Sequence, residues 1–274
     1  MQFRSTVWLV VLAGLLPAAV AARAETPELA SYRAAYELAI DESGDLASSA
    51  TVSGRMVVEF TGSACGGYKS KMRIVTEGED ADGNAQVTDA RTDTLETDNG
   101  RFQFDNETYV NDALAEQSVG VATRKADGID VVLSKPGKKS FMLGHELAFP
   151  TEQMKRILAA AEQGQHFVAM DIFDGSQDGE VVFATAAVIG KQSTAPDDFG
   201  DDTLVGEAGF AALPHWPVTV SYFEKGSGTD DAPTYVTSFV VYANGIGAKL
   251  RIDYGKFALV GHLSHLEMLP TPAC

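Results

Sequence analysis

Tyr68-Lys69-Ser70-Lys71-Met72-Arg73-Ile74 is the stretch that best defines the fold, because its side chains alternate with a period of two. Tyr68, Met72 and Ile74 fall on one face of an extended chain, and the basic residues between them fall on the other. Successive side chains of a β-strand point to opposite faces of its sheet. The alternation therefore predicts an antiparallel strand with one buried face and one solvated face.

The same alternation recurs in segments that are spread over the whole chain. They are residues 55–60, 101–105, 129–134 and 250–254. Asp82-Gly83, Asp127-Gly128 and Asn244-Gly245 supply residues that tolerate positive φ, as tight hairpin turns require. Two further segments, 181–189 and 235–242, are apolar on both faces and must be covered on each side. A strongly curled antiparallel sheet or open barrel would cover them, so the predicted class is mainly all-β.

One segment follows the helical period instead. Thr151 is the expected N-cap, and Glu152 would lie where the helix dipole favours negative charge. Apolar residues then recur at i, i+3, i+4 and i+7, namely Met154, Ile157, Leu158 and Ala161. The pattern predicts an amphipathic helix over 151–163 that ends at Gly164. The residues expected toward water are Lys155, Arg156 and Glu162. We expect the apolar stripe to plug or cover one opening of the sheet, with partner docking as the alternative.

Residues 1–24 have the pattern of a secretory signal peptide. Arg4 precedes an apolar stretch over 7–20, and Ala22-Arg23-Ala24 then places small residues at the −3 and −1 positions. The apolar stretch is shorter than the about 20 residues of a membrane-spanning helix, so an uncleaved anchor is the less favoured alternative. Cleavage between Ala24 and Glu25 would release residues 25–274, and the periplasm of a bacterium is the expected compartment.

The chain is strongly acidic. Its 21 Lys and Arg residues stand against 38 Asp and Glu residues, which gives a formal net charge of −17. Such a balance repels nucleic-acid phosphates and anionic lipid headgroups, so we expect neither nucleic-acid binding nor electrostatic docking to a membrane. Maintenance of solubility explains the charge most simply. Docking to a basic partner is the alternative.

The two cysteines, Cys65 and Cys274, are predicted to form a structural disulfide. An exported chain with two thiols favours this pairing, and neither thiol has a C-x-x-C context or a nearby base that would suggest catalysis. The bridge would tie the C-terminus to the early part of the fold. It would also cross any boundary placed in the middle of residues 25–274, where no low-complexity linker is found, so we expect one domain.

The sequence carries no recognisable catalytic or metal-binding motif. His145-Glu146 begins like a zinc motif, but Phe149 stands in the place of its second histidine. The segment 174–179 resembles the front of a calcium loop, but Thr185 replaces the bidentate glutamate, and a hairpin turn explains the segment more simply. His262-Leu263-Ser264-His265 would place its two histidines on opposite faces of a strand unless a bulge intervened. We therefore expect no catalytic residue, no cofactor and no metal.

Several short motifs, taken in order, resemble one family. They are Tyr32-Arg33-Ala34-Ala35-Tyr36-Glu37-Leu38, Gly62-Ser63-Ala64-Cys65-Gly66-Gly67-Tyr68, Phe149-Pro150-Thr151-Glu152, Phe173-Asp174-Gly175-Ser176 and the terminal Cys274. The chain is similar, over essentially its whole mature length, to the EipB family of periplasmic cell-envelope integrity proteins. The resemblance implies about fourteen antiparallel strands coiled into an open, spiral-like barrel. It also implies a disulfide between Cys65 and Cys274 and a role in maintaining the bacterial envelope under stress.

Two functional hypotheses follow from the sequence. The first is a non-enzymatic envelope factor, with a monomer favoured, that binds a periplasmic protein or an apolar lipid or lipoprotein ligand. The second is a hydrolase of envelope polymers whose carboxylates or histidines come together from distant strands. A continuous apolar cavity would favour ligand carriage, an exposed apolar groove would favour protein binding, and a cleft of converging carboxylates or histidines would favour the hydrolase.

Overall fold

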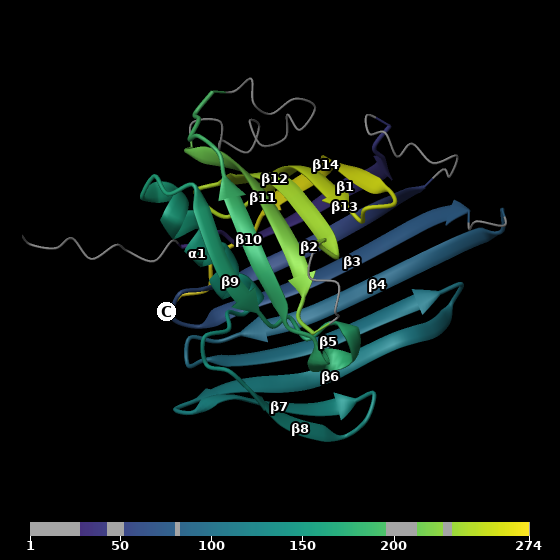
Figure 1. The fold of residues 1–274 in the computed structure, drawn as a ribbon. Helices are drawn as coiled ribbons and strands as arrows, with labels where there is room; N and C mark the ends of the chain where they lie inside the picture. The colour runs from purple at the N-terminus through teal and green to yellow at the C-terminus, as the bar shows by residue number, and fades with distance from the viewer. Residues whose placement is uncertain (1–27, 43–51, 80–82, 196–212, 227–231, 274) are drawn as a thin grey trace, which may run out of the picture.

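Antiparallel strands form one 14-stranded sheet in the computed structural model (Figure 1). The structure describes residues 28–42, 52–79, 83–195, 213–226 and 232–273. The first strands are β1 (Tyr32–Ile40), β2 (Ser53–Ser63), β3 (Gly67–Glu79), β4 (Ala85–Glu96), β5 (Arg101–Val110), β6 (Ala113–Lys125), β7 (Gly128–Lys135) and β8 (Lys139–Leu143). After α1 (Pro150–Glu162) come β9 (Phe167–Ile172), α2 (Gln177–Glu180), β10 (Phe183–Ile189), β11 (His215–Glu224), β12 (Tyr235–Tyr242), β13 (Gly247–Asp253) and β14 (Ala258–Met268).

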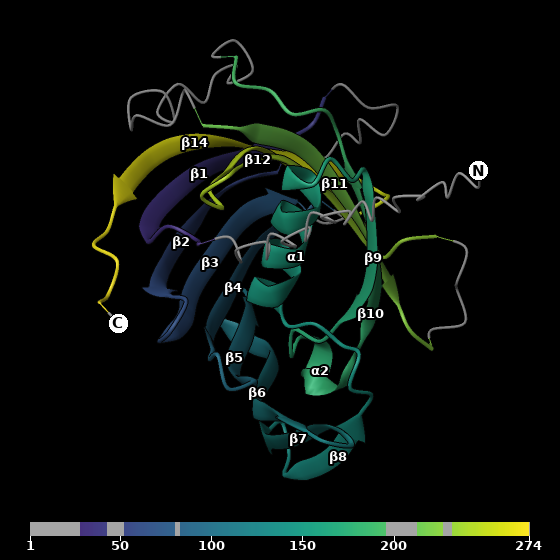
Figure 2. The same cartoon turned by 90° about the vertical axis from the view of Figure 1, so that its left-hand side faces the viewer.

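The sheet is open and strongly curled (Figure 2). Its strand order is β8-β7-β6-β5-β4-β3-β2-β1-β14-β13-β12-β11-β10-β9, so β8 and β9 form the two edges. The first and last strands, β1 and β14, pair in the middle and join the two halves of the chain. The prediction of an open antiparallel barrel with one amphipathic helix is confirmed.

The alternation that predicts these strands also determines which side chains line the interior. Met72 of β3 lies opposite Val58 of β2, and Ile74 lies opposite Met56. These four residues belong to one apolar cluster, whereas the basic residues between them on β3 are exposed. The inner face of β2 and β3 is therefore apolar and the outer face is charged, as the sequence predicts.

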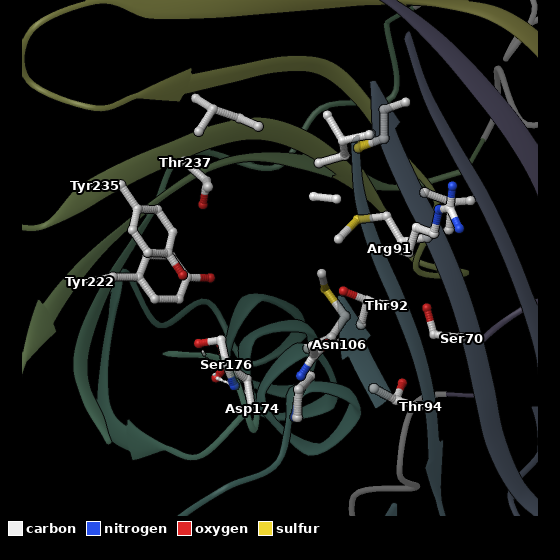
Figure 3. Close-up of a pocket in the computed structure, with 18 of the residues that line it drawn as sticks. Ser70, Arg91, Thr92, Thr94, Asn106, Asp174, Ser176, Tyr222, Tyr235 and Thr237 are labelled. Carbon is white, nitrogen blue, oxygen red and sulfur yellow. Dashed lines mark hydrogen bonds between the residues drawn. The ribbon is translucent and has the colours of Figure 1, made fainter. Parts of the chain in front are cut away.

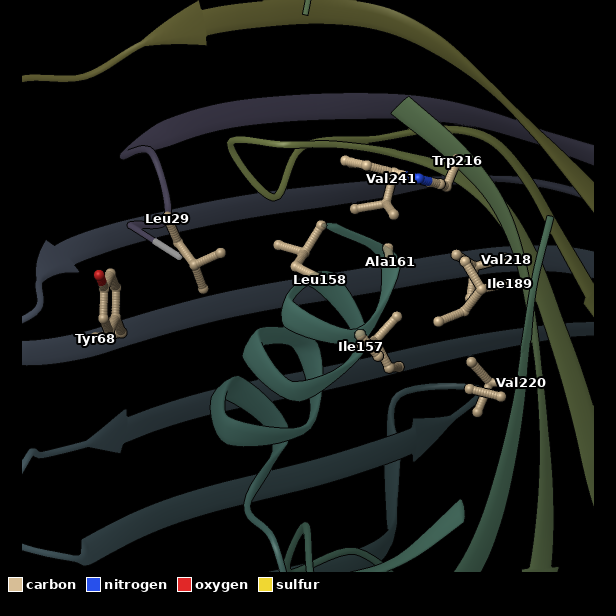
Figure 4. Packing of buried hydrophobic residues seen from close by; sticks show 12 residues of the cluster. Leu29, Tyr68, Ile157, Leu158, Ala161, Ile189, Trp216, Val218, Val220 and Val241 are labelled. Carbon is tan, nitrogen blue, oxygen red and sulfur yellow. The ribbon is translucent and has the colours of Figure 1, made fainter. Parts of the chain in front are cut away.

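Helix α1 lies inside the curl and contacts both walls (Figure 4). Leu158 is 0% exposed, and Ile157 is 1% exposed. The cluster around them also contains Leu29, Tyr68, Ala160, Ala161, Ala187, Ile189, Trp216, Val218, Val220 and Val241. The helix thus fills part of the interior between β3 on one side and β10 to β12 on the other, which agrees with the predicted plug.

The start of α1 differs from the prediction in one respect. The N-cap is Phe149, with Pro150 in the first turn, and Thr151 lies within the helix. The free amide hydrogens of the first turn bond to Glu96 at the end of β4: Thr151 N lies 2.8 Å from Oε2, and Glu152 N lies 3.0 Å from Oε1. A carboxylate from a distant strand therefore takes the place of a local cap, because it satisfies these donors and carries the charge that the dipole favours.

Arg124 of β6 fixes the same helix end. Its guanidinium donates to the carbonyl oxygens of Leu147 at 2.7 Å and His145 at 3.1 Å, and it also pairs with Glu152. The guanidinium carbon lies 4.9 Å from the centre of the Phe149 ring. These contacts tie the segment before α1 to the wall of the sheet.

The helix face expected toward water is only partly solvated. Arg156 and Glu162 are exposed, as predicted. Lys155 is half-buried, and its ammonium lies 4.3 Å from the centre of the Tyr68 ring. Burial lowers the pKa of Lys155. The prediction for Lys155 is wrong because the curl of the sheet brings β3 over this side of the helix.

Glu96→Gln is expected to change the pH dependence of stability. Burial raises the pKa of Glu96, although hydrogen bonds from Thr151 and the amide of Glu152 oppose the shift. The folded state therefore retains this proton where the unfolded chain has released it. The contribution of protonated Glu96 to stability is complete below the ordinary glutamate pKa of about 4.3. It is lost as the pH rises through the higher pKa of the folded state. Urea unfolding at several pH values measures the free energy of unfolding, which should fall less with rising pH in Glu96→Gln than in the unsubstituted protein. If the two proteins lose stability in parallel, the assignment of a raised pKa to Glu96 is wrong.

Two of the predicted hairpin turns lie in the described residues. Asn244-Gly245 connects β12 to β13, with Gly245 at φ 86° and its amide 2.8 Å from the Tyr242 carbonyl oxygen. Asp127-Gly128 connects β6 to β7, with Gly128 at φ 155°. Both turns are confirmed. Asp82 of the third predicted turn lies outside the described residues.

Candidate functional site

A cavity of about 820 Å3 occupies the interior of the curled sheet (Figure 3). One wall comes from β2 to β6, and the other comes from β10 to β13. Met154 of α1 and residues of the loop between β9 and α2 also line it. Its volume falls within the range of small-molecule sites, which is roughly 300–1,000 Å3.

Most of the lining is apolar. The apolar residues are Leu29, Tyr32, Met56, Val58, Phe60, Met72, Ile74, Ala90, Pro150, Met154, Phe183, Leu250, Ile252 and Tyr254. Those that lie on strands occupy inward positions, where the period of two places a side chain at every second residue. Burial raises the pKa of Tyr32 to about 12, so its phenol is neutral at physiological pH. The cavity thus offers an extended apolar surface inside the molecule.

Hydroxyl and carboxyl groups gather at one end of the cavity. Asp174 and Ser176 come from the loop before α2, and Tyr222, Tyr235 and Thr237 come from β11 and β12 (Figure 3). The rings of Tyr222 and Tyr235 stack with centroids 4.3 Å apart, and their hydroxyls point into the cavity. Burial raises the pKa of Tyr222 to about 12 and also raises that of Tyr235. Both phenols are therefore neutral and can donate or accept hydrogen bonds.

The loop that carries Asp174 is held against the wall by Gly175. The Gly175 carbonyl oxygen accepts hydrogen bonds from Asn106, at 3.0 Å, and from Ser118. Gly175 has φ 73°, and a Cβ atom at this position would lie 2.4 Å from the Phe104 ring. Only glycine combines this backbone conformation with so close an approach to the ring.

Asp174 is held within its own loop. Its Oδ1 accepts hydrogen bonds from the Ser176 amide at 2.9 Å and the Ser176 hydroxyl at 2.8 Å. Burial raises the pKa of Asp174, although these bonds oppose the shift. The segment 174–179, which resembles the front of a calcium loop, forms part of the connection between the antiparallel neighbours β9 and β10.

A second cavity of about 480 Å3 adjoins the first. Ile74, Ala90, Ile252 and Tyr254 line both cavities. The second cavity extends the interior space toward Glu79 and Lys256. The two cavities are therefore neighbours that share part of one wall, and the cluster of polar groups lies in the first of them.

The predicted disulfide and cleavage site are only partly covered by the described residues. Cys65 lies in the turn between β2 and β3, with its Sγ 3.3 Å from the Ser63 Oγ. Cys274, Ala24 and Glu25 lie outside the described residues. The disulfide and the cleavage between Ala24 and Glu25 therefore stay predictions.

A bulge does intervene between His262 and His265, which is the exception that the sequence leaves open. The pairing of β1 with β14 shifts register between Ala35 and Tyr36, which places a β-bulge at Ser264. His262 then lies opposite Glu37 and His265 opposite Ala35, two positions that share the outer face of β1. Both histidines are exposed on the outside of the sheet. They lie away from the cavity, and His145 is also exposed.

The polar cluster of the cavity is the feature that sequence reasoning missed. A signal exists in part, because Ser70, Thr92, Thr94 and Asn106 are polar residues at inward positions that line the cavity. A polar residue at an inward position of a strand breaks the apolar alternation and indicates an unfilled or solvated interior. The meeting of Asp174 with Tyr222 had no such signal, since it depends on the curl of the sheet.

Three comparisons identify relatives of this chain. The sequence profile of the EipB-like family matches residues 23–270. The cell envelope integrity protein EipB of Brucella abortus (strain 2308) is 38% identical over 256 residues, which cover 93% of this chain and 89% of that protein. A crystal structure of a β-barrel-like protein from Brucella abortus, described as a domain of unknown function, has a TM-score of 0.79 and 37% identity. That match covers 88% of this chain and 99% of the other.

Among the described residues, no helix has both the length and the apolar character needed to cross a membrane. The family profile spans nearly the whole chain, and the solved structure shares its fold. The chain therefore belongs to the EipB-like family.

Proposed function

We propose that this protein is a periplasmic factor that supports cell-envelope integrity, without catalysis, by holding an apolar envelope ligand inside its curled sheet. The name of its relative from Brucella abortus supports the envelope role. The cavity of about 820 Å3, with its mainly apolar lining, is the observation that supports the ligand. Burial of an apolar chain in such a space is favourable by roughly 25 cal/mol per Å2 of apolar surface removed from water.

The cavity favours ligand carriage over the hydrolase hypothesis. A hydrolase needs acid and base groups that converge in a cleft. Asp174, Glu107 and Glu116 are the carboxyl groups among the described residues that line the cavity. Each already accepts hydrogen bonds from its surroundings: Asp174 from Ser176, Glu107 from Tyr109 and Gln117, and Glu116 from the amide of Asp178. The apolar side chains that line the cavity would not contribute to the hydrolysis of a polar envelope polymer, whereas they can pack against an acyl chain.

Ala90→Trp is expected to weaken ligand binding at least tenfold, which corresponds to about 1.4 kcal/mol. Ala90 lines both cavities, so a large side chain at this position would fill the space between them. The measurement is the fluorescence of N-phenyl-1-naphthylamine, a neutral apolar probe, titrated with each protein. Lipids extracted from protein purified from the periplasm should decrease in parallel.

Val188→Trp is the matched control. Val188 lies on β10 and is 55% exposed, so the same side chain at this position leaves the interior unchanged. We expect it to bind the probe as the unsubstituted protein does. If Ala90→Trp and Val188→Trp bind the probe equally well, the cavity is not the ligand site and the proposed function falls.

A further inference from the structure

We propose that the polar end of the cavity is a head-group subsite for an apolar ligand that carries hydrogen-bond donors, a primary amine above all. Asp174 is the group that accepts these donors. This inference rests on the proposed function and adds to it the chemical class of the polar end of the ligand.

The charges around the cavity favour a cationic head group. Among the described residues, Asp174, Glu107 and Glu116 are the carboxyl groups that line it. Within the described part of the chain, Arg91 is the one basic residue that lines the cavity. Its guanidinium pairs with Asp89 at 2.6 Å and lies 4.7 Å from the centre of the Tyr109 ring. These partners belong to the outer face of the sheet, because Asp89 also pairs with the exposed Arg73. The described lining therefore offers no free cation to offset the repulsion between these carboxyl groups and a phosphate or carboxylate head.

The hydrogen bonds of Asp174 indicate which of its two carboxyl oxygens would contact the ligand. Both hydrogen bonds from Ser176 reach Oδ1, and the amide of Asp174 itself also bonds to the carboxyl group. We assign Oδ2, which accepts neither bond from Ser176, to the ligand. Burial disfavours the ionised form of this carboxyl group. An ammonium group at Oδ2 would restore the ionised form, because an opposite charge nearby offsets the loss of solvation.

The neighbouring tyrosines suit the same head group. The Tyr222 and Tyr235 hydroxyls point into the cavity beside the Asp174 loop (Figure 3). Phenol oxygens accept hydrogen bonds from an amine, and the face of an aromatic ring attracts a cation. Phe183 packs edge-on against both rings, with centroids 6.3 Å from Tyr222 and 5.9 Å from Tyr235, and holds them in place.

Three ligands of equal chain length test the inference on the unsubstituted protein. Dodecylamine, dodecanol and dodecanoate each compete with N-phenyl-1-naphthylamine, and the concentration for half displacement is measured. We expect the amine to bind roughly tenfold more tightly than the carboxylate, with the alcohol between them. The chain is acidic overall, so amine bound to the outer surface must be distinguished from amine bound in the cavity. Ala90→Trp makes this distinction, because it blocks the cavity alone.

Asp174→Asn tests the residue. Its amide oxygen can still accept the two bonds from Ser176, so the loop should keep its shape. We expect the preference for amine over carboxylate to fall to about twofold or less. Asp93→Asn is the control, since Asp93 pairs with Lys69 and Lys71 on the outer face and makes the same change of charge. It should leave the preference intact.

The outcomes separate the inference from the proposed function. If the three ligands displace the probe equally, or if Asp174→Asn keeps the full preference, the head-group subsite is wrong while ligand carriage stands. If the unsubstituted protein binds neither the probe nor any of the three ligands, both proposals fall.

Discussion

Leu158→Ala is expected to lower the free energy of unfolding by roughly 2–5 kcal/mol. Leu158 is 0% exposed and belongs to the cluster through which α1 contacts both walls of the curled sheet. Truncation removes apolar contacts and leaves a void that two walls of sheet cannot readily close. Urea unfolding followed by circular dichroism measures the loss.

Leu114→Ala is the matched control for this prediction. Leu114 lies on β6 and is 51% exposed, so the same truncation there should change stability by less than about 0.5 kcal/mol. Similar losses at Leu158 and Leu114 would contradict the assignment of α1 to the core. A selective loss at Leu158 would show that the helix supports the curl, and with it the cavity to which Met154 of the same helix contributes.

The strands of the sheet could be predicted from the sequence because apolar and polar residues alternate along a strand with one buried face. Met72 and Ile74 predict an inward face, and the structure places both on the inside. Ser70 occupies the inward position between Tyr68 and Met72, and it lines the cavity. A single polar residue in an apolar row carries too little information to distinguish a cavity from a filled core.

Contacts between distant segments could not be predicted in this way. Thr151 has the chemistry of an N-cap, but Pro150 starts the helix one residue earlier and Glu96 of β4 satisfies the free amides. The β-bulge at Ser264 likewise arises from the pairing of β14 with β1. Local propensity gives way to tertiary contacts in both places, and such contacts depend on how far the sheet curls.

One geometry accounts for both the stability of the core and the cavity. The curl brings β10 to β12 opposite β3, and α1 fills the space between them with apolar side chains. Beside the first turn of α1 the two walls enclose the cavity, which Gln177 of the short helix α2 also lines. An open sheet tolerates such a space because each strand between the edges β8 and β9 is stabilised by its two neighbours and by the filled parts of the interior.

Cys65→Ser is expected to lower the free energy of unfolding by up to about 5 kcal/mol and to leave the fold intact. A disulfide between Cys65 and Cys274 would close a loop of roughly 200 residues, and the chain-entropy model gives such a loop its largest effect on the unfolded state. The fold should persist because the core is large enough to be stable without a covalent link. Urea unfolding gives the loss, and circular dichroism at room temperature reports the fold.

The pairing itself is tested by a mutant cycle. Cys274→Ser should cause the same loss as Cys65→Ser, and the double variant should lose no more than either single variant, because both substitutions remove one bond. Oxidised protein should also be two hydrogens lighter than reduced protein by intact mass. Additive losses in the double variant would show that the two cysteines act independently. A Cys65→Ser protein that is unfolded at room temperature would show instead that the curled sheet cannot hold its shape without the link.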